Sequence, residues 1–273
     1  YAFVAQTNAS LFLTGKAGTG KTTFLRYVRE HVAKNMMVVA PTGVAAINAK
    51  GVTIHSFFQL SFGPQIGLEN ASPEQNRYSK EKINIIRSLD LLVIDEISMV
   101  RADILDAIDR VMRRFKNGRK PFGGAQVLMI GDLQQLSPVV KDNEWQLLKA
   151  YYTTPYFFSS RAFQQCHAIG IELKHIYRQD NPEFIGIINE IRNNNLSQSS
   201  ANELNKRYLP NFVPDINDGY IALTTHNNRA EKTNNLELDK LKTKSHIYQA
   251  IIEGKFPEYS YPNKERLTLK VGA

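Results

Sequence analysis

With 273 residues, of which 42% are hydrophobic and 22% charged, the chain has the composition of a globular protein with one or two domains. No apolar run reaches the roughly 18 residues that a membrane-spanning helix needs, which argues against a membrane role. The single cysteine, Cys166, excludes an internal disulfide and a cysteine-based zinc site, and suits a reducing compartment. The net charge of +8 favours a polyanionic partner.

Short apolar runs alternate with amphipathic stretches in the first part of the chain, a pattern typical of an α/β fold with a parallel sheet covered on both faces. The runs lack polar alternation, so they predict strands buried on both sides. These strands are Ser10–Thr14, Met36–Ala40, Leu91–Ile94 and Gln126–Ile130. Helices are predicted over Thr22–Ala33 and Asp103–Phe115, and an irregular loop over residues 61–80.

The second part of the chain has weaker patterns. We expect a strand at Ala168–Leu173, a helix from Pro182, a strand at Tyr220–Leu223 and a helix over Arg229–Leu241. A boundary near residues 160–180 divides a first domain, 1–165, from a second domain, 166–273. The second domain is expected to be incomplete, since the chain ends within a predicted strand, Leu267–Ala273.

A phosphate-binding motif lies between the first predicted strand and helix. Residues 15–22 (GKAGTGKT) satisfy the spacing G-x-x-x-x-G-K-[S/T], in which glycines let several N–H groups point at one phosphate beside a helix N-terminus. Lys21 would reach the β- and γ-phosphates of ATP, and the Thr22 hydroxyl would bind Mg²⁺. The predicted nucleotide-binding residues are Gly15, Ala17, Gly18, Thr19, Gly20, Lys21, Thr22 and Thr23.

The second half of such a site should be a carboxylate at the end of a neighbouring buried strand. Asp95 and Glu96 directly follow Leu91–Ile94. Asp95 would hold the magnesium ion, and Glu96 would accept a proton from the attacking water or orient it. The pair favours hydrolysis over transfer to a second substrate. The alternative is an acidic helix N-cap ahead of Ile97 and Ser98.

A third polar segment, Gly131–Pro138, follows the next buried strand. A side-chain amide at that strand end would contact the γ-phosphate and sense its loss. The alternative is a turn, which needs only Gly131 and Asp132.

The order of these segments resembles that of superfamily-one helicases. Motifs I, Ia, Ib, II and III correspond to Gly15–Thr22, Ala40–Ala46, Thr53–Phe57, Val93–Met99 and Gly131–Val139. Asp103–Gln126, and above all Lys120–Gln126 (KPFGGAQ), resembles the signature segment of the PIF-type (petite-integration-frequency) DNA helicases. Leu173–Gln179 resembles motif IV, and Leu267–Ala273 a segment that normally continues toward motifs V and VI.

This resemblance implies two RecA-like domains that clamp ATP between them. Gln135 corresponds to the γ-phosphate sensor and Arg178 to an arginine finger, which would act from the second domain only when the domains close. A salt bridge of Arg178 to Asp180 or Glu183 is the alternative. Gln6 corresponds to an adenine-binding glutamine upstream of motif I.

The resemblance also implies DNA-binding residues. Pro41, Thr42 and His55 lie where family members contact single-stranded DNA, and Asn227 belongs to a Thr-Asn…Asn pattern in which His226 replaces the threonine. A core histidine is the alternative for His55. Aromatic side chains in these segments would stack on bases; they are Phe57, Phe58 and Phe122. For Phe57 and Phe58 a place in the core is the favoured alternative.

The function expected from the resemblance is an ATP- and Mg²⁺-dependent DNA helicase. It would move 5′-to-3′ on single-stranded DNA and unwind forked or structured DNA, including guanine quadruplexes, in repair, recombination or telomere maintenance. A RecD-like motor subunit and, for this chain alone, a nucleotide-gated DNA-binding module remain as alternatives. The compact motor suggests a monomeric bacterial cytoplasmic protein.

Overall fold

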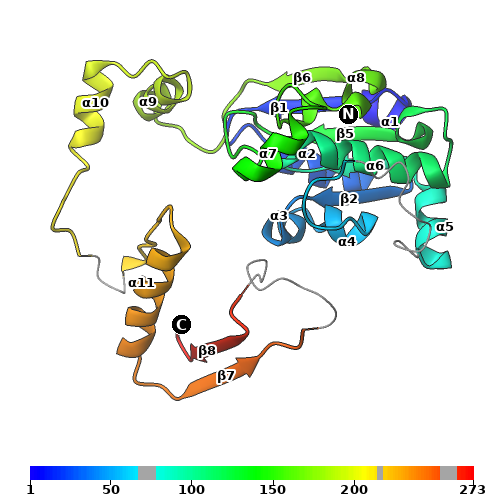
Figure 1. Cartoon of the computed structure of the whole chain (residues 1–273). Coiled ribbons are helices and arrows are strands. Elements are labelled where there is room, and N and C mark those ends of the chain that lie inside the picture. Colours follow the sequence, from blue (N-terminus) through cyan, green and yellow to red (C-terminus); the bar gives the residue numbers. More distant parts are fainter. Residues whose placement is uncertain (67–77, 214–217, 253–262) are drawn as a thin grey trace. The chain divides into compact units, whose positions relative to one another are not determined.

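The computed structural model describes residues 1–66, 78–213, 218–252 and 263–273 (Figure 1). These residues form two compact units, Tyr1–Ala201 and Asn202–Ala273. Part of the loop predicted over 61–80 lies outside the described residues, and the helix α5 (Lys80–Ser88) follows it. None of the described helices is both long and apolar enough to cross a bilayer.

The first unit is built on a six-stranded sheet in which every pairing is parallel, which confirms the predicted α/β class. All four predicted strands of the first domain form, with bounds that agree to within one residue. The strands are β1 (Leu11–Gly15), β2 (Met36–Ala40), β3 (Val52–Thr53), β4 (Leu91–Ile94), β5 (Gln126–Ile130) and β6 (Ile169–Leu173).

The strand order is β3-β2-β4-β5-β1-β6. It corrects one sequence expectation, because β4, which carries the carboxylates, is not next to β1, which carries the phosphate motif. β5 lies between them and pairs with both. Since parallel strands end at the same edge, the segment after β5 lies between the other two motifs.

Alternate residues of each strand enter two separate cores, one on each face of the sheet. Leu92 and Met129 belong to one core, and Val93 and Leu128 to the other. The core that contains Leu92, here the first core, is completed by side chains from α4 (Ile54–Phe58), α5, α6 (Ala102–Phe115) and α8 (Arg161–Cys166). The core that contains Val93, the second core, is bordered by α1 (Ala2–Gln6), α2 (Lys21–His31) and α3 (Gly43–Asn48). Burial on both faces explains the uninterrupted apolar runs.

The signature segment is part of the first core. Phe122 lies in the 3-10 turn η3 (Pro121–Gly124) and is fully buried, with a left-handed φ of 49°. Its N–H donates to Asp109 of α6, whose carboxylate also accepts from Arg113 at 2.6 Å. Phe57 and Phe58 are equally buried. The core alternative is therefore confirmed for Phe57 and Phe58. Phe122, for which base stacking was predicted, is a core residue as well and is too buried to stack on a base.

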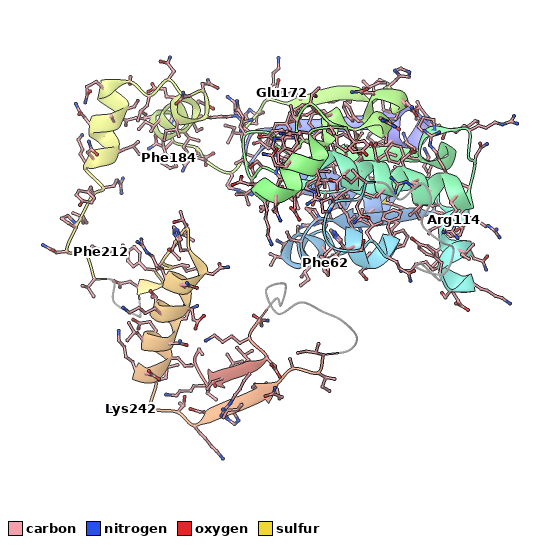
Figure 2. The ribbon with its side chains drawn as sticks, viewed as in Figure 1. Phe62, Arg114, Glu172, Phe184, Phe212 and Lys242 are labelled. Atoms are coloured by element: carbon pink, nitrogen blue, oxygen red, sulfur yellow. The ribbon has the colours of Figure 1, made fainter. Side chains whose placement is uncertain are left out.

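Replacing Phe122 by alanine should lower the free energy of unfolding by about 3–5 kcal/mol, because a buried aromatic leaves a cavity. Phe184→Ala on α9 (Pro182–Arg192) is the matched control: that ring is 41% exposed (Figure 2), and the loss should stay below about 1 kcal/mol. Urea titration of the wild-type protein and the two variants measures both losses of unfolding free energy. Equal losses would contradict a core role for the signature segment.

The strand β6 joins the first sheet as its edge, beside β1, although the sequence placed these residues in the second domain. After β6 the first unit continues through α9, which confirms the helix predicted from Pro182 and in which Ile187 is the buried residue. The compact units thus divide after residue 201 rather than near 165. Whether 166–273 corresponds to a second RecA-like domain stays a prediction.

The second unit contains α11 (Asn227–Lys240) and an antiparallel pair, β7 (Ser245–Gln249) and β8 (Arg266–Lys270), after α10 (Gln198–Asn205), which spans the division. The predicted helix Arg229–Leu241 is confirmed as α11. The predicted strand Tyr220–Leu223 is wrong: its residues pair with no described strand, and Leu223 is 94% exposed. The apolar run alone had suggested a strand, but a strand needs a partner.

Candidate functional site

The loop between β1 and α2 has the backbone of an anion cradle. Gly18 and Gly20 adopt left-handed φ angles of 78° and 92°, and Gly20 is the N-cap of α2. Lys21 Nζ donates to the carbonyl oxygens of Gly15 at 2.6 Å and Lys16 at 3.0 Å, which holds the ammonium across the loop. Free N–H groups at a helix N-terminus beside a lysine are the usual ligands of a nucleotide phosphate.

The chain after β6 packs directly against this loop. The Tyr177 N–H donates to the Gly18 carbonyl at 2.8 Å, and a Cβ on Gly18 would lie 2.6 Å from Cβ of Arg178. Arg178 therefore belongs to the same compact unit as the phosphate loop. This corrects the expectation that Arg178 comes from a second domain; β6 is the edge strand beside β1, so its C-terminal end reaches the loop without domain closure.

Gly18→Ala should weaken ATP binding by about tenfold or more, because the new Cβ meets Arg178 and the left-handed φ disfavours alanine. The control is Gly118→Ala, where a Cβ meets no atom within 4 Å. Titration with a fluorescent ATP analogue gives both affinities. Equal binding by the two variants would show that the Gly18–Arg178 contact is dispensable.

A pocket of about 860 Å³ opens over the loop and unites the predicted catalytic side chains. Lys21, Glu96, Gln135 and Arg178 all line it, together with the rest of the loop from Ala17 to Thr23. The volume lies within the range of small-molecule sites, roughly 300–1,000 Å³. The glycine cradle and the size of the pocket fit a nucleoside triphosphate.

Three aromatic residues that the sequence analysis did not assign to the site line this pocket: Phe24, Tyr27 and Tyr177. Tyr177, 71% exposed, and Tyr27, on the outer part of α2, both line it. Tyr27 is itself packed edge-on by Tyr1, with ring centroids 5.3 Å apart. The position of Tyr177 beside Arg178 in the motif IV segment was a usable signal, whereas Tyr27 has none in the sequence. Tyr27 is also stacked on His31, with ring centroids 4.1 Å apart, so the more exposed ring of Tyr177 is the one suited to stacking on a nucleotide base.

The two carboxylates after β4 lie beside the lysine. Burial raises the pKa of Asp95 and that of Glu96, and the charge of Lys21 opposes both shifts. Burial also lowers the pKa of Lys21, against the charges of Asp132, Glu96 and Asp95. Glu96 has a left-handed φ of 51°, and its side chain caps no helix. Glu96 does occupy the N-cap position of the 3-10 turn η2 (Ile97–Met99), as the alternative expected, but without a capping hydrogen bond from its carboxylate.

The predicted magnesium ligands are Thr22 and Asp95. Thr22 lines the pocket, and Asp95 accepts a hydrogen bond from the Glu96 N–H at 3.0 Å. Among the described residues, no group of three or more His, Cys, Asp or Glu side chains gathers around one point. This donor set fits Mg²⁺, which takes one or two protein ligands and completes its shell with water and phosphate oxygens.

Gln6, the predicted adenine-binding residue, is the exposed last residue of α1 and is not among the residues that line the pocket. Gly15, predicted to bind the nucleotide, is likewise not among the residues that line the pocket, although its carbonyl accepts from Lys21. A Cβ on Gly15 would lie 2.6 Å from the carbonyl oxygen of Leu173, so only glycine fits there. The role of Gln6 stays a prediction.

Three predicted DNA-binding residues lie together at the ends of β2 and β3. Ala40 and Thr53 are opposite each other in the register, so the two strands end side by side. Pro41 and Thr42 directly follow β2, and His55 is the second residue of α4, which directly follows β3. The Thr42 hydroxyl caps α3, and the His55 ring stacks on Phe62, which is 52% exposed (Figure 2). Burial lowers the pKa of His55, with a contribution from Arg101.

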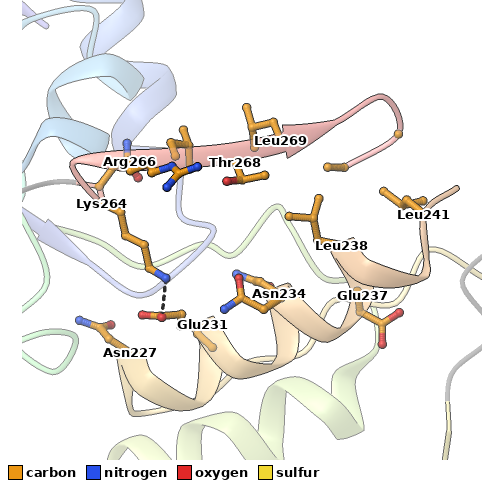
Figure 3. Close-up of a pocket in the computed structure, with 16 residues that line it drawn as sticks. Asn227, Glu231, Asn234, Glu237, Leu238, Leu241, Lys264, Arg266, Thr268 and Leu269 are labelled. Carbon is orange, nitrogen blue, oxygen red and sulfur yellow. Dashed lines mark ion pairs between the residues drawn. The ribbon is translucent and has the colours of Figure 1, made fainter. Parts of the chain in front are cut away.

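Asn227, the fourth predicted DNA-binding residue, is the first residue of α11 in the second unit. There it lines a groove between α11 and β8, in which Lys264 pairs with Glu231 at 2.5 Å (Figure 3). Asn234, from the same sequence pattern, faces the same groove (Figure 3). The predicted contact of Asn227 with DNA stays a prediction.

A phosphate loop after β1, paired carboxylates after β4 and a polar segment after the strand between them define a P-loop nucleoside triphosphatase of the RecA-like kind. The profile of the PIF1-like helicase family matches residues 2–202. The chain therefore belongs to this family.

Individual relatives agree with this assignment. The chain is 33% identical to the ATP-dependent DNA helicase PIF1 of Saccharomyces cerevisiae over 99% of its own length and 32% of the relative's, and 32% identical to the Homo sapiens protein, covering 40% of it. It thus spans about a third of these relatives. A Bacteroides Pif1 structure bound to single-stranded DNA is 42% identical, with a TM-score of 0.82 over 97% of this chain and 61% of that one. A Bacteroides Pif1 complex with ADP-AlF3 and single-stranded DNA has a TM-score of 0.83 at 40% identity.

Proposed function

We propose that this chain is the ATPase-bearing part of a DNA helicase that moves 5′-to-3′ on single-stranded DNA. The observation that carries the proposal is the single pocket in which Lys21, Glu96, Gln135 and Arg178 meet above the glycine cradle. It is supported by relatives named ATP-dependent DNA helicases and by a related structure bound to single-stranded DNA.

Each side chain has a distinct role in this proposal. Lys21 and the loop N–H groups bind the phosphates, and Thr22 and Asp95 hold Mg²⁺, which supplies further charge neutralisation when bound. Glu96 accepts a proton from the attacking water, for which its raised pKa is suited. Arg178, fixed against Gly18, neutralises charge that develops on the γ-phosphate.

The DNA path we propose crosses the ends of β2 and β3. Pro41 and Thr42 would contact the DNA backbone there, and His55, whose ring stacks on Phe62, lies beyond the neighbouring strand end. Such contacts do not distinguish one base sequence from another, as a translocating motor requires. Unwinding of guanine quadruplexes and roles in repair, recombination or telomere maintenance belong to the same proposal.

The polarity is tested by strand displacement with the protein that carries this chain. Forked substrates bearing only a 5′ or only a 3′ single-stranded tail are compared in the presence of ATP and Mg²⁺. Unwinding is expected from the 5′ tail alone, together with ATP hydrolysis that single-stranded DNA stimulates. Unwinding from the 3′ tail alone would overturn the polarity, and hydrolysis that ignores DNA would overturn the motor function.

A second candidate function is that of a DNA-binding module whose affinity for DNA depends on the bound nucleotide. It is favoured because the chain spans only 32% of the yeast relative. Binding of labelled single-stranded DNA with and without ATP, alongside the hydrolysis rate, separates the two functions. We also infer a bacterial source, because identity to the Bacteroides structure is 42% against 29% to that from Candida albicans. A cytoplasmic location is part of the same proposal.

A further inference from the structure

The carboxylate of Asp132, directly after β5, collects hydrogen bonds from three places in the first unit. Arg192, the last residue of α9, donates from Nη1 to Oδ2 at 2.6 Å and from Nη2 to Oδ1 at 2.7 Å. The Gln134 N–H donates to Oδ1 at 3.1 Å, and Gln135 Nε2 donates to Oδ2 at 3.0 Å. An ionised carboxylate offers about four acceptor positions, so all those of Asp132 are used.

This arrangement keeps a buried charge in place. The Asp132 side chain is 1% exposed and that of Arg192 is 19% exposed. Burial by itself would raise the pKa of Asp132, but the hydrogen bonds from Arg192, Gln134 and Gln135, with the charge of Arg192, lower it below its ordinary value. Asp132 is therefore a fixed anion whose orientation is set by the two-pronged guanidinium.

Asp132 connects Arg192 to the nucleotide pocket. β5 lies between β1 and β4, so Asp132 lies close enough to Lys21 for their charges to interact. The bond from Gln135 to Asp132 uses one of the two N–H groups of the amide and fixes its plane, which leaves the other for the pocket that Gln135 lines. Arg192 does not line the pocket. Its charge reaches Lys21 directly and helps to lower the pKa of that lysine, whereas its hydrogen bonds connect it to Gln135 through Asp132.

We propose that Arg192 is a positioning residue of the ATPase site: it holds Asp132 so that Gln135 presents its amide to the γ-phosphate, and it couples the end of α9 to the presence of that phosphate. The inference rests on the proposed ATPase function and adds a residue that the sequence analysis did not single out. The loss of the γ-phosphate, which frees the Gln135 amide, is transmitted along this chain of bonds to α9.

The test is nucleotide discrimination by Arg192→Ala. ADP affinity should stay within about twofold, because the phosphate loop is intact, while the preference for a non-hydrolysable ATP analogue over ADP should fall about tenfold. Arg192→Lys keeps the charge but loses the two-pronged geometry, so it should restore the preference only in part. Arg113→Ala is the control, since it breaks a comparable ion pair with Asp109 on α6. It should lower stability without changing the preference.

A double-mutant cycle with Gln135→Ala identifies the route. If Arg192 acts through Gln135, Arg192→Ala should change the nucleotide preference little in the Gln135→Ala background. Additive effects, or equal losses of ATP-analogue and ADP affinity, would overturn the inference. Should Arg192→Ala not fold, Arg192→Lys takes its place in the cycle. Binding is measured without turnover, so a wild-type protein that never hydrolyses ATP refutes the proposed function and still leaves the cycle decisive for Arg192.

Discussion

Replacing Lys21 by alanine is expected to lower kcat/KM for ATP by about a thousandfold and to weaken nucleotide binding. Two effects combine. The phosphates lose the ammonium group held across the loop, and three carboxylates, Asp132, Glu96 and Asp95, lose the cation with which they interact. The electrostatic potential at the phosphate site then becomes more negative, which repels the phosphates. The measurement is ATP turnover in the presence of single-stranded DNA, with nucleotide affinity determined separately.

Lys80→Ala is the control for Lys21. This lysine is an exposed residue at the start of α5, away from the pocket, and its loss should leave both turnover and affinity unchanged. Thermal unfolding of both variants excludes loss of the fold as the cause. If Lys21→Ala retains DNA-stimulated hydrolysis, the assignment of this pocket to ATP collapses.

Glu96→Gln has the second large effect and separates chemistry from binding. The amide has the shape of the carboxylate but cannot accept the proton of the attacking water, so kcat should fall by about a hundredfold or more. ATP affinity should be kept or increased, because one negative charge beside the phosphates is removed. Single-turnover hydrolysis and nucleotide titration measure the two quantities independently.

The control for Glu96 is Glu30→Gln, an exposed position on α2 that lines no part of the pocket. It should behave like the wild type. A Glu96→Gln protein that hydrolyses ATP at the wild-type rate would show that another group activates the water. Loss of ATP affinity in this variant would instead indicate a role in binding.

Local features were predictable because local sequence determines them. Buried strands such as Leu91–Ile94 need continuous apolar runs, and the cradle needs Gly18 and Gly20, the left-handed residues of the loop. Each pattern lies within a few residues, so the phosphate loop and the carboxylates were found from the sequence. The resemblance then supplied Gln135 and Arg178, which the structure places in the same pocket.

The sequence by itself thus determined the class of the first unit, the strands that carry its motifs and most of the residues that meet in the pocket over the phosphate loop. Only the tertiary structure decided that β5 separates the two ATP motifs, that Arg178 lies in the same unit as the loop, and that Arg192 holds Asp132 from 60 residues away. Phe122 likewise proved to be core. Strand order and distant ion pairs depend on how the whole chain packs, and no periodicity within one segment encodes that.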